Sequence, residues 1–179
     1  GCHRFGVEVD SAPVFPNEPD RAVVYGISYP QREVRGSLVP KFSEVTPGSF
    51  TIGLMHANVG NNPDHDPYAP CSIEDLEQIG IDYWALGHVH TREVLRRSNP
   101  TIVYPGTPQG RAPNERGARG VYLVDVDDAG WVDIAFHAVD LVRWESPQID
   151  IANVETEQAL LGAIEQSLLD LSVEADGRS

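Results

Sequence analysis

The sequence has no long hydrophobic run and almost no cysteine. No apolar stretch approaches the ~20 residues that a membrane-spanning helix needs, and no secretory signal is visible, so we expect a cytoplasmic protein that does not enter a membrane. The two cysteines, Cys2 and Cys71, form neither a disulfide framework nor a metal-type pair, and we expect reduced thiols. The only methionine is Met55 and the first residue is Gly1, so we expect that preceding sequence has been removed.

Positive charge is scarce overall but concentrated in one stretch. The net charge of −14 argues against nucleic-acid binding through the charge of the whole molecule. From Arg92 to Arg119, however, there are six arginines and two acidic residues, a net charge of +4, whereas the remainder carries −18. The stretch is either a solvated arginine-rich loop region or a phosphate-facing surface, because arginine binds phosphate through a bidentate fork.

The hydrophobic pattern predicts a mixed α/β protein in which short strands outnumber helices. At 179 residues, of which 41% are hydrophobic, the chain can form one domain, or one domain and part of another. We expect a first domain at 1–146 and the start of a second at 147–179. The expected strands are 1–10, 21–30, 50–56, 81–87, 101–106, 120–127, 131–139 and 147–154, and residues 31–49 are expected to form a short helix or an irregular loop.

Two helices have clear signals. Ser72 is a capping residue followed by Asp75 three positions later and by Gly80 at the end, which predicts a short helix. Residues 156–171 predict an amphipathic helix. Its apolar face consists of Leu160, Leu161, Ile164, Leu168 and Leu171.

Histidines follow two of the predicted buried strands. His56 ends one strand, His88 and His90 come directly after another, and Gly106 ends a third. Because open α/β sheets place ligands at such strand ends, we expect these residues at one sheet edge. Residues i and i+2 of an extended chain lie ~6.5 Å apart, which suits two ions held ~3.5–4 Å apart better than one ion. A single histidine after a strand is more often structural, so His56 alone is a weaker candidate than the Gly-His-Val-His string.

The other histidines are weaker candidates. His3 and His137 lie within predicted strands, where we expect structural roles. His65 lies between two acidic residues on the loop beyond His56 and is a candidate for substrate contact. We add Arg92 and Arg111, from the arginine-rich stretch, as candidate substrate-binding residues.

Three segments together resemble a known superfamily. They are "LMHANVG", "DYWALGHVHTREVL" and "IVYPGTPQGRAPNERGARGVYLVDVD". They resemble the second half of a calcineurin-like metallophosphoesterase, and within that superfamily they are most similar to the SbcD-type and YhaO-type DNA-repair exonucleases. The resemblance covers about residues 1–146, and the pattern from 147 is similar to the start of that group's capping domain.

The resemblance implies a fold and a metal centre. The fold is part of a four-layer α/β/β/α sandwich with the beginning of an appended α/β capping domain. His56 and His88 match ligands of the second metal and His90 matches a ligand of the first. The ions are two divalent metals, usually Mn²⁺, and the chemistry is attack of metal-bound water on a phosphodiester of DNA. The resemblance also suggests an SbcC-like ATPase partner and homodimerisation.

The sequence departs from the superfamily in what it omits. The motifs Asp-x-His, Gly-Asp-x-x-Asp and Gly-Asn-His-Asp or Glu occur nowhere in the chain. They would supply the bridging carboxylate, further ligands and the histidine that protonates the leaving group, and we expect them upstream of Gly1. We therefore expect this chain alone to bind metal weakly and to be inactive.

Three functions remain open from the sequence. The first is a DNA phosphodiesterase, and the second is a phosphatase or nucleotide phosphodiesterase of the same superfamily, which shares the ligand motifs. The third is a non-enzymatic binding module with a vestigial metal site, which would fold as a monomer that holds its metal tightly.

Overall fold

The computed structural model describes residues 2–43, 45, 48–60, 66–175 and 177–178. These residues form two compact units. Unit 1 consists of 1–106 and 122–135, and unit 2 of 107–121 and 136–179. The domain boundary that the sequence predicts after residue 146 stays a prediction.

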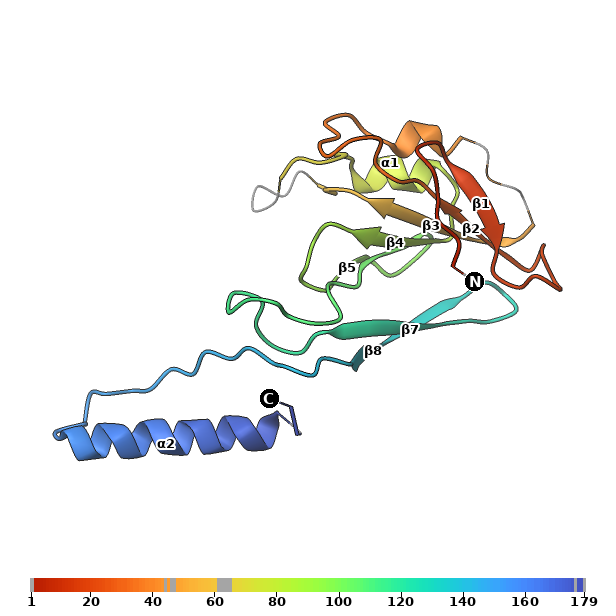
Figure 1. The fold of residues 1–179 in the computed structure, drawn as a ribbon. Coiled ribbons are helices and arrows are strands. Elements are labelled where there is room, and N and C mark those ends of the chain that lie inside the picture. The colour runs from red at the N-terminus through yellow and green to blue at the C-terminus, as the bar shows by residue number, and fades with distance from the viewer. Residues whose placement is uncertain (1, 44, 46–47, 61–65, 176, 179) are drawn as a thin grey trace. The chain divides into compact units, whose positions relative to one another are not determined.

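Unit 1 is built on a six-stranded sheet with the strand order β1-β2-β3-β4-β6-β5 (Figure 1). The strands are β1 (Asp10–Pro13), β2 (Ala22–Gly26), β3 (Phe50–His56), β4 (Tyr83–Gly87), β5 (Glu93–Arg96) and β6 (Thr101–Tyr104). The central strands β2, β3, β4 and β6 are parallel, and β1 and β5 are antiparallel to their neighbours. Together with the helices described below, this confirms a mixed α/β fold.

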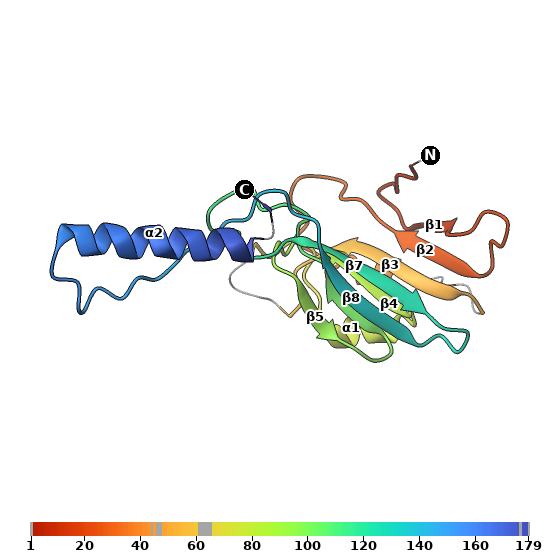
Figure 2. The same cartoon turned by 90° about the horizontal axis from the view of Figure 1, so that it is seen from below.

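Helix α1 (Ile73–Gln78) forms where the sequence predicts a capped helix. The Ser72 hydroxyl accepts a hydrogen bond from the Asp75 backbone N–H at 3.1 Å, and the Asp75 carboxylate accepts one from the Ser72 N–H at 2.8 Å. This reciprocal pair satisfies backbone donors that a helix start leaves unbonded. α1 lies beside one face of the sheet (Figure 1; seen from below in Figure 2) and buries Leu76 against Trp84, whose indole N–H donates to the Leu76 carbonyl.

The two faces of the sheet are buried to different degrees. On β3, Thr51, Gly53 and Met55 are buried and join the side that holds Trp84. The alternating residues Ile52 and Leu54 point to the other face, where Leu54 is 37% exposed although it lies in a central strand. Since successive side chains of a strand point to opposite faces, the main core lies on the α1 side.

Four sequence expectations need correction or addition. Residues 2–9 are not a strand, and the first strand lies at 10–13, where the predicted strand 1–10 ends and its connection to the strand 21–30 begins. Residues 147–154 contain no strand, because the structure describes no neighbouring strand with which they pair. β5 was not expected. The segment 31–49, predicted as a short helix or loop, contains the 3₁₀ helix η1 (Val39–Lys41) in otherwise irregular chain.

A hairpin and a long helix complete the structure. β7 (Gly120–Val126) and β8 (Val132–Ala138) form a two-stranded sheet, and the Asp127 carboxylate accepts hydrogen bonds from the N–H groups of Ala129 and Trp131 in their turn. α2 (Glu157–Glu174) begins at Thr156, whose hydroxyl accepts from the Ala159 N–H, and it confirms the predicted second helix. No helix among the described residues is both long and apolar enough to cross a membrane.

Candidate functional site

Two of the predicted histidines meet at the carboxyl ends of neighbouring parallel strands. His56 is the last residue of β3 and pairs in register with Gly87, the last residue of β4, which His88 follows. The centroids of the His56 and His88 rings are 5.1 Å apart, and the ring planes make an angle of 67°. The parallel register therefore brings together imidazoles that are 32 positions apart in the sequence.

His88 has an unusual backbone. Its φ angle is 101°, in the region that side-chain-bearing residues rarely adopt. Such a conformation costs on the order of 1–3 kcal/mol and is found mainly at functional sites, where the surrounding structure holds it. Here one contact that holds the ring is a hydrogen bond of 2.9 Å between the His88 Nε2 and the backbone oxygen of Asp66. Since a carbonyl only accepts, Nε2 carries the hydrogen, and in the neutral ring the lone pair is then on Nδ1.

His56 is held in its neutral form. Burial, together with the positive charges that His88 and His90 can carry, lowers the pKa of His56 below its usual 6.5. A neutral imidazole is the form that binds metal ions. The Tyr29 hydroxyl donates to the His56 backbone oxygen at 2.7 Å, and the two rings are in edge contact at 5.3 Å. Gly87 leaves room for the ring, because a Cβ there would lie 2.9 Å from the His56 Nδ1.

His90 lies in the same loop as His88. Val89, between the two, is buried, whereas His88 is half-buried and His90 is exposed. The loop packs against the turn at Gly106, where a Cβ would lie 2.7 Å from the His90 backbone oxygen. Gly106 also has a φ of +76°, so a side chain is disfavoured there on two grounds. His90 is near enough to His56 for its charge to influence the pKa of His56.

The chain around His56 is held in place by residues that the sequence did not single out. The Tyr104 hydroxyl donates to the Ala57 carbonyl at 2.6 Å and accepts from the Val59 N–H at 2.9 Å. The buried Asn58 donates through Nδ2 to the Asp66 backbone oxygen at 3.2 Å, the same oxygen that His88 contacts. The one available signal was the position of Asn58, a polar residue two places beyond the end of a buried strand.

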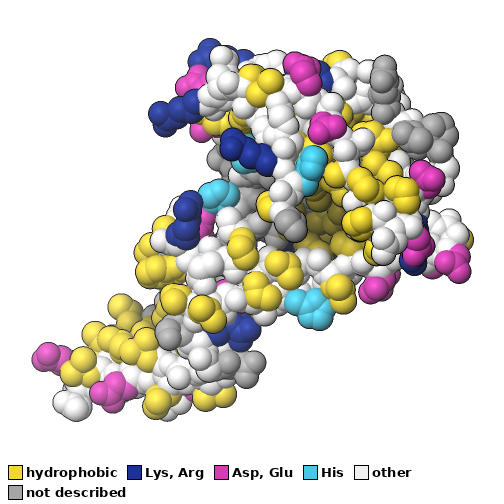
Figure 3. Space-filling model, turned by 45° about the vertical axis from the view of Figure 1, so that its right-hand side comes forward, with side chains coloured by type: hydrophobic (Ala, Val, Ile, Leu, Met, Phe, Trp, Pro, Cys, Tyr) yellow, Lys and Arg dark blue, Asp and Glu magenta, His cyan; other side chains and the backbone are white. Residues whose placement is uncertain are grey.

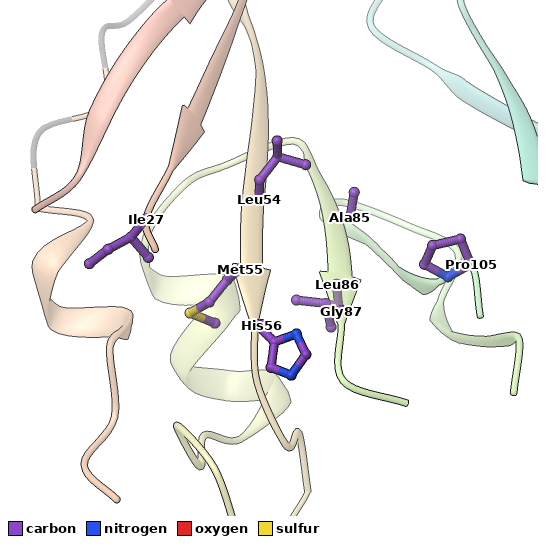
Figure 4. Close-up of a pocket in the computed structure, with 8 residues that line it drawn as sticks. All are labelled: Ile27, Leu54, Met55, His56, Ala85, Leu86, Gly87 and Pro105. Carbon is purple, nitrogen blue, oxygen red and sulfur yellow. The ribbon is translucent and has the colours of Figure 1, made fainter. Parts of the chain in front are cut away.

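An open hollow adjoins the site (Figure 4). It has a volume of about 320 Å³ and is lined by Ile27, Leu54, Met55, His56, Ala85, Leu86, Gly87 and Pro105. The His56 imidazole is the one titratable group among these lining residues, and its ring lies beside Gly87. The hollow is therefore lined by apolar side chains and by one imidazole ring.

The candidate substrate-binding residues belong to different parts of the chain. Arg92 is exposed and lies two residues after His90 in unit 1. Arg111 lies in unit 2, where its backbone N–H donates to the Glu115 carboxylate at 2.6 Å. His65 lies outside the described residues.

Other arginines of the positive stretch make structural contacts. The Arg96 guanidinium pairs with Glu77. The Arg116 side chain donates to the Pro113 carbonyl, and the buried Arg119 donates to the Arg116 carbonyl. Three of the six arginines thus make contacts within their own unit.

The site fits a metal ion only in part. Neutral imidazoles are ligands for first-row divalent metals. The His56 and His88 rings lie close together, and a hydrogen bond to the Asp66 backbone oxygen holds the His88 ring. Within the described ranges, however, no three His, Cys, Asp or Glu side chains are gathered so that they could hold an ion. His56 and His88 could therefore each offer a ring nitrogen to a metal ion, and the described residues do not gather a third ligand beside them.

The chain was compared with known proteins. No protein-family model matches the chain. The chain is 35% identical over 170 residues to a protein of Bacillus subtilis (strain 168) named as the uncharacterized metallophosphoesterase YhaO. The alignment covers 94% of this chain and 41% of that protein, so the chain spans less than half the length of its relative. The similarity supports the metallophosphoesterase superfamily for this chain.

Proposed function

We propose that this chain supplies the histidine ligands of a metal-dependent phosphoester hydrolase. The observation that carries the proposal is the meeting of His56 and His88 at adjacent parallel strand ends, with His90 in the same loop. It occurs in a chain that is 35% identical to a metallophosphoesterase. Two divalent ions, Mn²⁺ by our proposal, would neutralise phosphate charge and lower the pKa of bound water when present.

The proposed substrate is DNA, as for the SbcD-type and YhaO-type exonucleases that the sequence resembles. The excess of arginine between Arg92 and Arg119 supports a polyanionic substrate, because arginine pairs with phosphate in bidentate geometry. An SbcC-like ATPase partner and a homodimeric parent protein belong to the same proposal. Among the described residues no carboxylates complete the site, so we propose that the chain alone binds metal weakly and does not turn over substrate.

Titration with Mn²⁺, followed by calorimetry and electron paramagnetic resonance, tests the metal proposal. We expect weak Mn²⁺ binding, and we expect His88→Ala to lower the affinity by more than about tenfold. Mutating a residue that only hydrogen-bonds to a metal ligand already lowers metal affinity by about 10–100-fold. His137→Ala is the matched control, because His137 is an exposed histidine of β8 in unit 2 and is not a candidate ligand, and we expect no change. The control matters because 27 acidic residues can bind Mn²⁺ loosely elsewhere.

Two results would contradict the metal proposal. Tight binding of two ions by the chain would mean that the carboxylates are present after all. Equal binding by the His88→Ala variant would mean that the ions are held outside the histidine cluster.

Fluorescence anisotropy with a short DNA duplex tests the substrate separately. We expect weak, salt-dependent binding, and we expect Arg92→Ala to reduce the slope of log affinity against log salt by about 0.9, the value for one phosphate contact. Arg35→Ala is the control, because Arg35 is exposed and pairs with Glu33 two residues away. If no duplex binds at low salt while Mn²⁺ does, the DNA substrate is wrong and the hydrolase proposal stands, with small phosphate esters as the next substrates to assay.

A further inference from the structure

Asn58 is a polar side chain in the interior of unit 1. It lies two residues beyond the end of β3, is 1% exposed, and stands between Ala57 and Val59, which are also buried. A buried amide costs free energy unless its polar groups are hydrogen-bonded. Histidine side chains are visible on the surface of the molecule (cyan in Figure 3), whereas this amide is enclosed. Its hydrogen bonds therefore indicate what the amide holds in place.

Asn58 binds the segment of chain that returns after β3. Its backbone N–H donates to the Tyr68 carbonyl at 2.9 Å, and its own carbonyl accepts from the Cys71 N–H at 3.2 Å. Its side-chain Nδ2 donates to the Asp66 backbone oxygen at 3.2 Å. Asn58 thus fastens the segment 66–71 through its backbone and its side chain, and the side-chain bond is the one made to Asp66.

The Asp66 backbone oxygen is the point at which Asn58 and His88 meet. It accepts from the Asn58 Nδ2 at 3.2 Å, from the His88 Nε2 at 2.9 Å and from the Tyr68 backbone N–H at 2.7 Å. The Tyr68 ring also contacts the His88 ring, with 5.7 Å between the two centroids. A carbonyl oxygen has two lone pairs, so three donors around it leave little freedom in the direction of the carbonyl. A change at Asn58 should therefore reach the His88 ring.

We propose that Asn58 is a positioning residue for His88. By directing the Asp66 carbonyl, Asn58 keeps the hydrogen of the His88 ring on Nε2 and leaves the lone pair on Nδ1. This inference rests on the proposed function, in which His88 is a metal ligand, because a neutral imidazole binds a metal through the nitrogen that carries no hydrogen. His88 needs such support, since its φ of 101° persists only where the surroundings hold it.

Nuclear magnetic resonance of the intact chain tests the proposal without any metal. In a ¹⁵N-labelled chain, the two ring nitrogens of a neutral imidazole give well-separated signals, and a His88→Gln variant identifies those of His88. At about pH 8.5, where an ordinary imidazole is neutral, we expect the hydrogen on Nε2. In Asn58→Ala we expect the ratio of the Nε2–H form to the Nδ1–H form to fall by about twofold to tenfold, the effect of one hydrogen bond of ordinary net strength.

Thr51→Val is the matched control. Thr51 is another buried polar residue of unit 1, 2% exposed, but it lies near the start of β3, where its hydroxyl donates to the Asp82 carboxylate at 2.7 Å. This variant loses a buried hydrogen bond at the opposite end of the strand, so we expect the His88 signals to stay unchanged. The buried indole N–H of Trp84 appears in the same spectra and shows whether the core is intact.

A second variant separates the lost bond from the lost volume. Asn58→Asp keeps the size of the side chain but replaces the amide donor by an oxygen, which cannot donate to the Asp66 carbonyl when the carboxyl is ionised. We expect the same fall in the ratio as in Asn58→Ala. If a variant loses the Trp84 signal, the tautomer of the unaltered chain still tests the proposal, because it requires no substitution.

Titration with Mn²⁺ adds a readout of the metal site. Asn58→Ala should lower the Mn²⁺ affinity by up to about tenfold, less than the loss of a residue bonded directly to a ligand, because Asn58 acts one hydrogen bond further away. If Mn²⁺ binding by the unaltered chain does not depend on His88, the proposed function fails. The tautomer measurement then still decides whether Asn58 positions the ring.

Three outcomes would overturn the proposal. A hydrogen on Nδ1 of His88 in the unaltered chain would mean that the bond to the Asp66 carbonyl does not set the tautomer. An unchanged ratio in both Asn58 variants would mean that the carbonyl is directed without the amide. An equal change in Thr51→Val would mean that any loosening of unit 1 alters the ring.

Discussion

The two units of this protein bury different kinds of side chain. The buried hydrophobic residues of the described chain all lie between Ala22 and Tyr104, within unit 1. In unit 2 the buried side chains are charged: Arg119 is 7% exposed and Asp140 is 3% exposed. Asp140 accepts two hydrogen bonds from Arg143, at 2.9 and 3.0 Å, and one from Arg178.

The two units are therefore stabilised in different ways. Hydrophobic burial is non-directional and grows with the area removed from water, so the stability of unit 1 depends on how much apolar surface its core buries. A buried carboxylate with arginine partners depends on geometry, and the loss of one member leaves the others desolvated. The hydrogen bonds from Arg143 accordingly lower the pKa of Asp140, which keeps it ionised. Unit 1 should therefore respond to changes in volume and unit 2 to changes in charge.

The largest expected effect is on the core of unit 1. Trp84 is fully buried, in edge contact with the Phe42 ring at 5.1 Å, so Trp84→Ala leaves a cavity. We expect the free energy of unfolding of unit 1 to fall by about 3–5 kcal/mol, measured by urea denaturation. Trp131→Ala makes the same chemical change at a residue that is 68% exposed and should cost less than about 0.5 kcal/mol. Equal losses in the two variants would refute the difference in packing.

The next effect concerns charge in unit 2. Asp140→Asn keeps the size of the side chain but removes the charge that faces Arg143 and Arg178. We expect unit 2 to lose about 3 kcal/mol, the lower end for breaking a buried ion pair, because the two arginine side chains are 15% and 19% exposed. Hydrogen exchange should show faster exchange in 136–146 and α2. Asp133→Asn, at an exposed position of β8, is the control and should change neither. Faster exchange in β3 and β4 as well would mean that the units do not unfold separately.

The sequence predicted the elements whose causes are local. Helix α1 follows from Ser72 and Asp75 alone, and β3 and β4 follow from continuous apolar runs. β5 was missed because Glu93 and Arg96 make its short segment polar, and it exists only through antiparallel pairing with β6. The predicted strand at 147–154 failed for the opposite reason, since an extended apolar pattern forms no strand without a neighbour.

In the candidate site, too, some features could be predicted from the sequence and others depend on tertiary contacts. That His56 and His88 would meet could be predicted, because parallel strands end at a common sheet edge. The φ angle of His88 and its bond to the Asp66 carbonyl could not, because they depend on how the loop after β3 folds back. Nor did the sequence indicate that the Tyr104 hydroxyl would bridge Ala57 and Val59. Loop conformation arises from tertiary contacts that no local pattern records.

The smallest effect is a pH dependence within unit 1. Burial, followed by the charges of His88 and His90, lowers the pKa of His56, so the unfolded chain takes up the proton before the folded one. The stabilisation is fully present above the ordinary pKa of 6.5 and is lost as the pH falls through the lowered pKa of the folded protein. Urea denaturation between about pH 8 and pH 5 should show unit 1 losing stability below this value. In His56→Gln, which keeps a polar side chain but does not titrate, the loss should be smaller. An unchanged pH profile in that variant would mean that other groups set the acid sensitivity of unit 1.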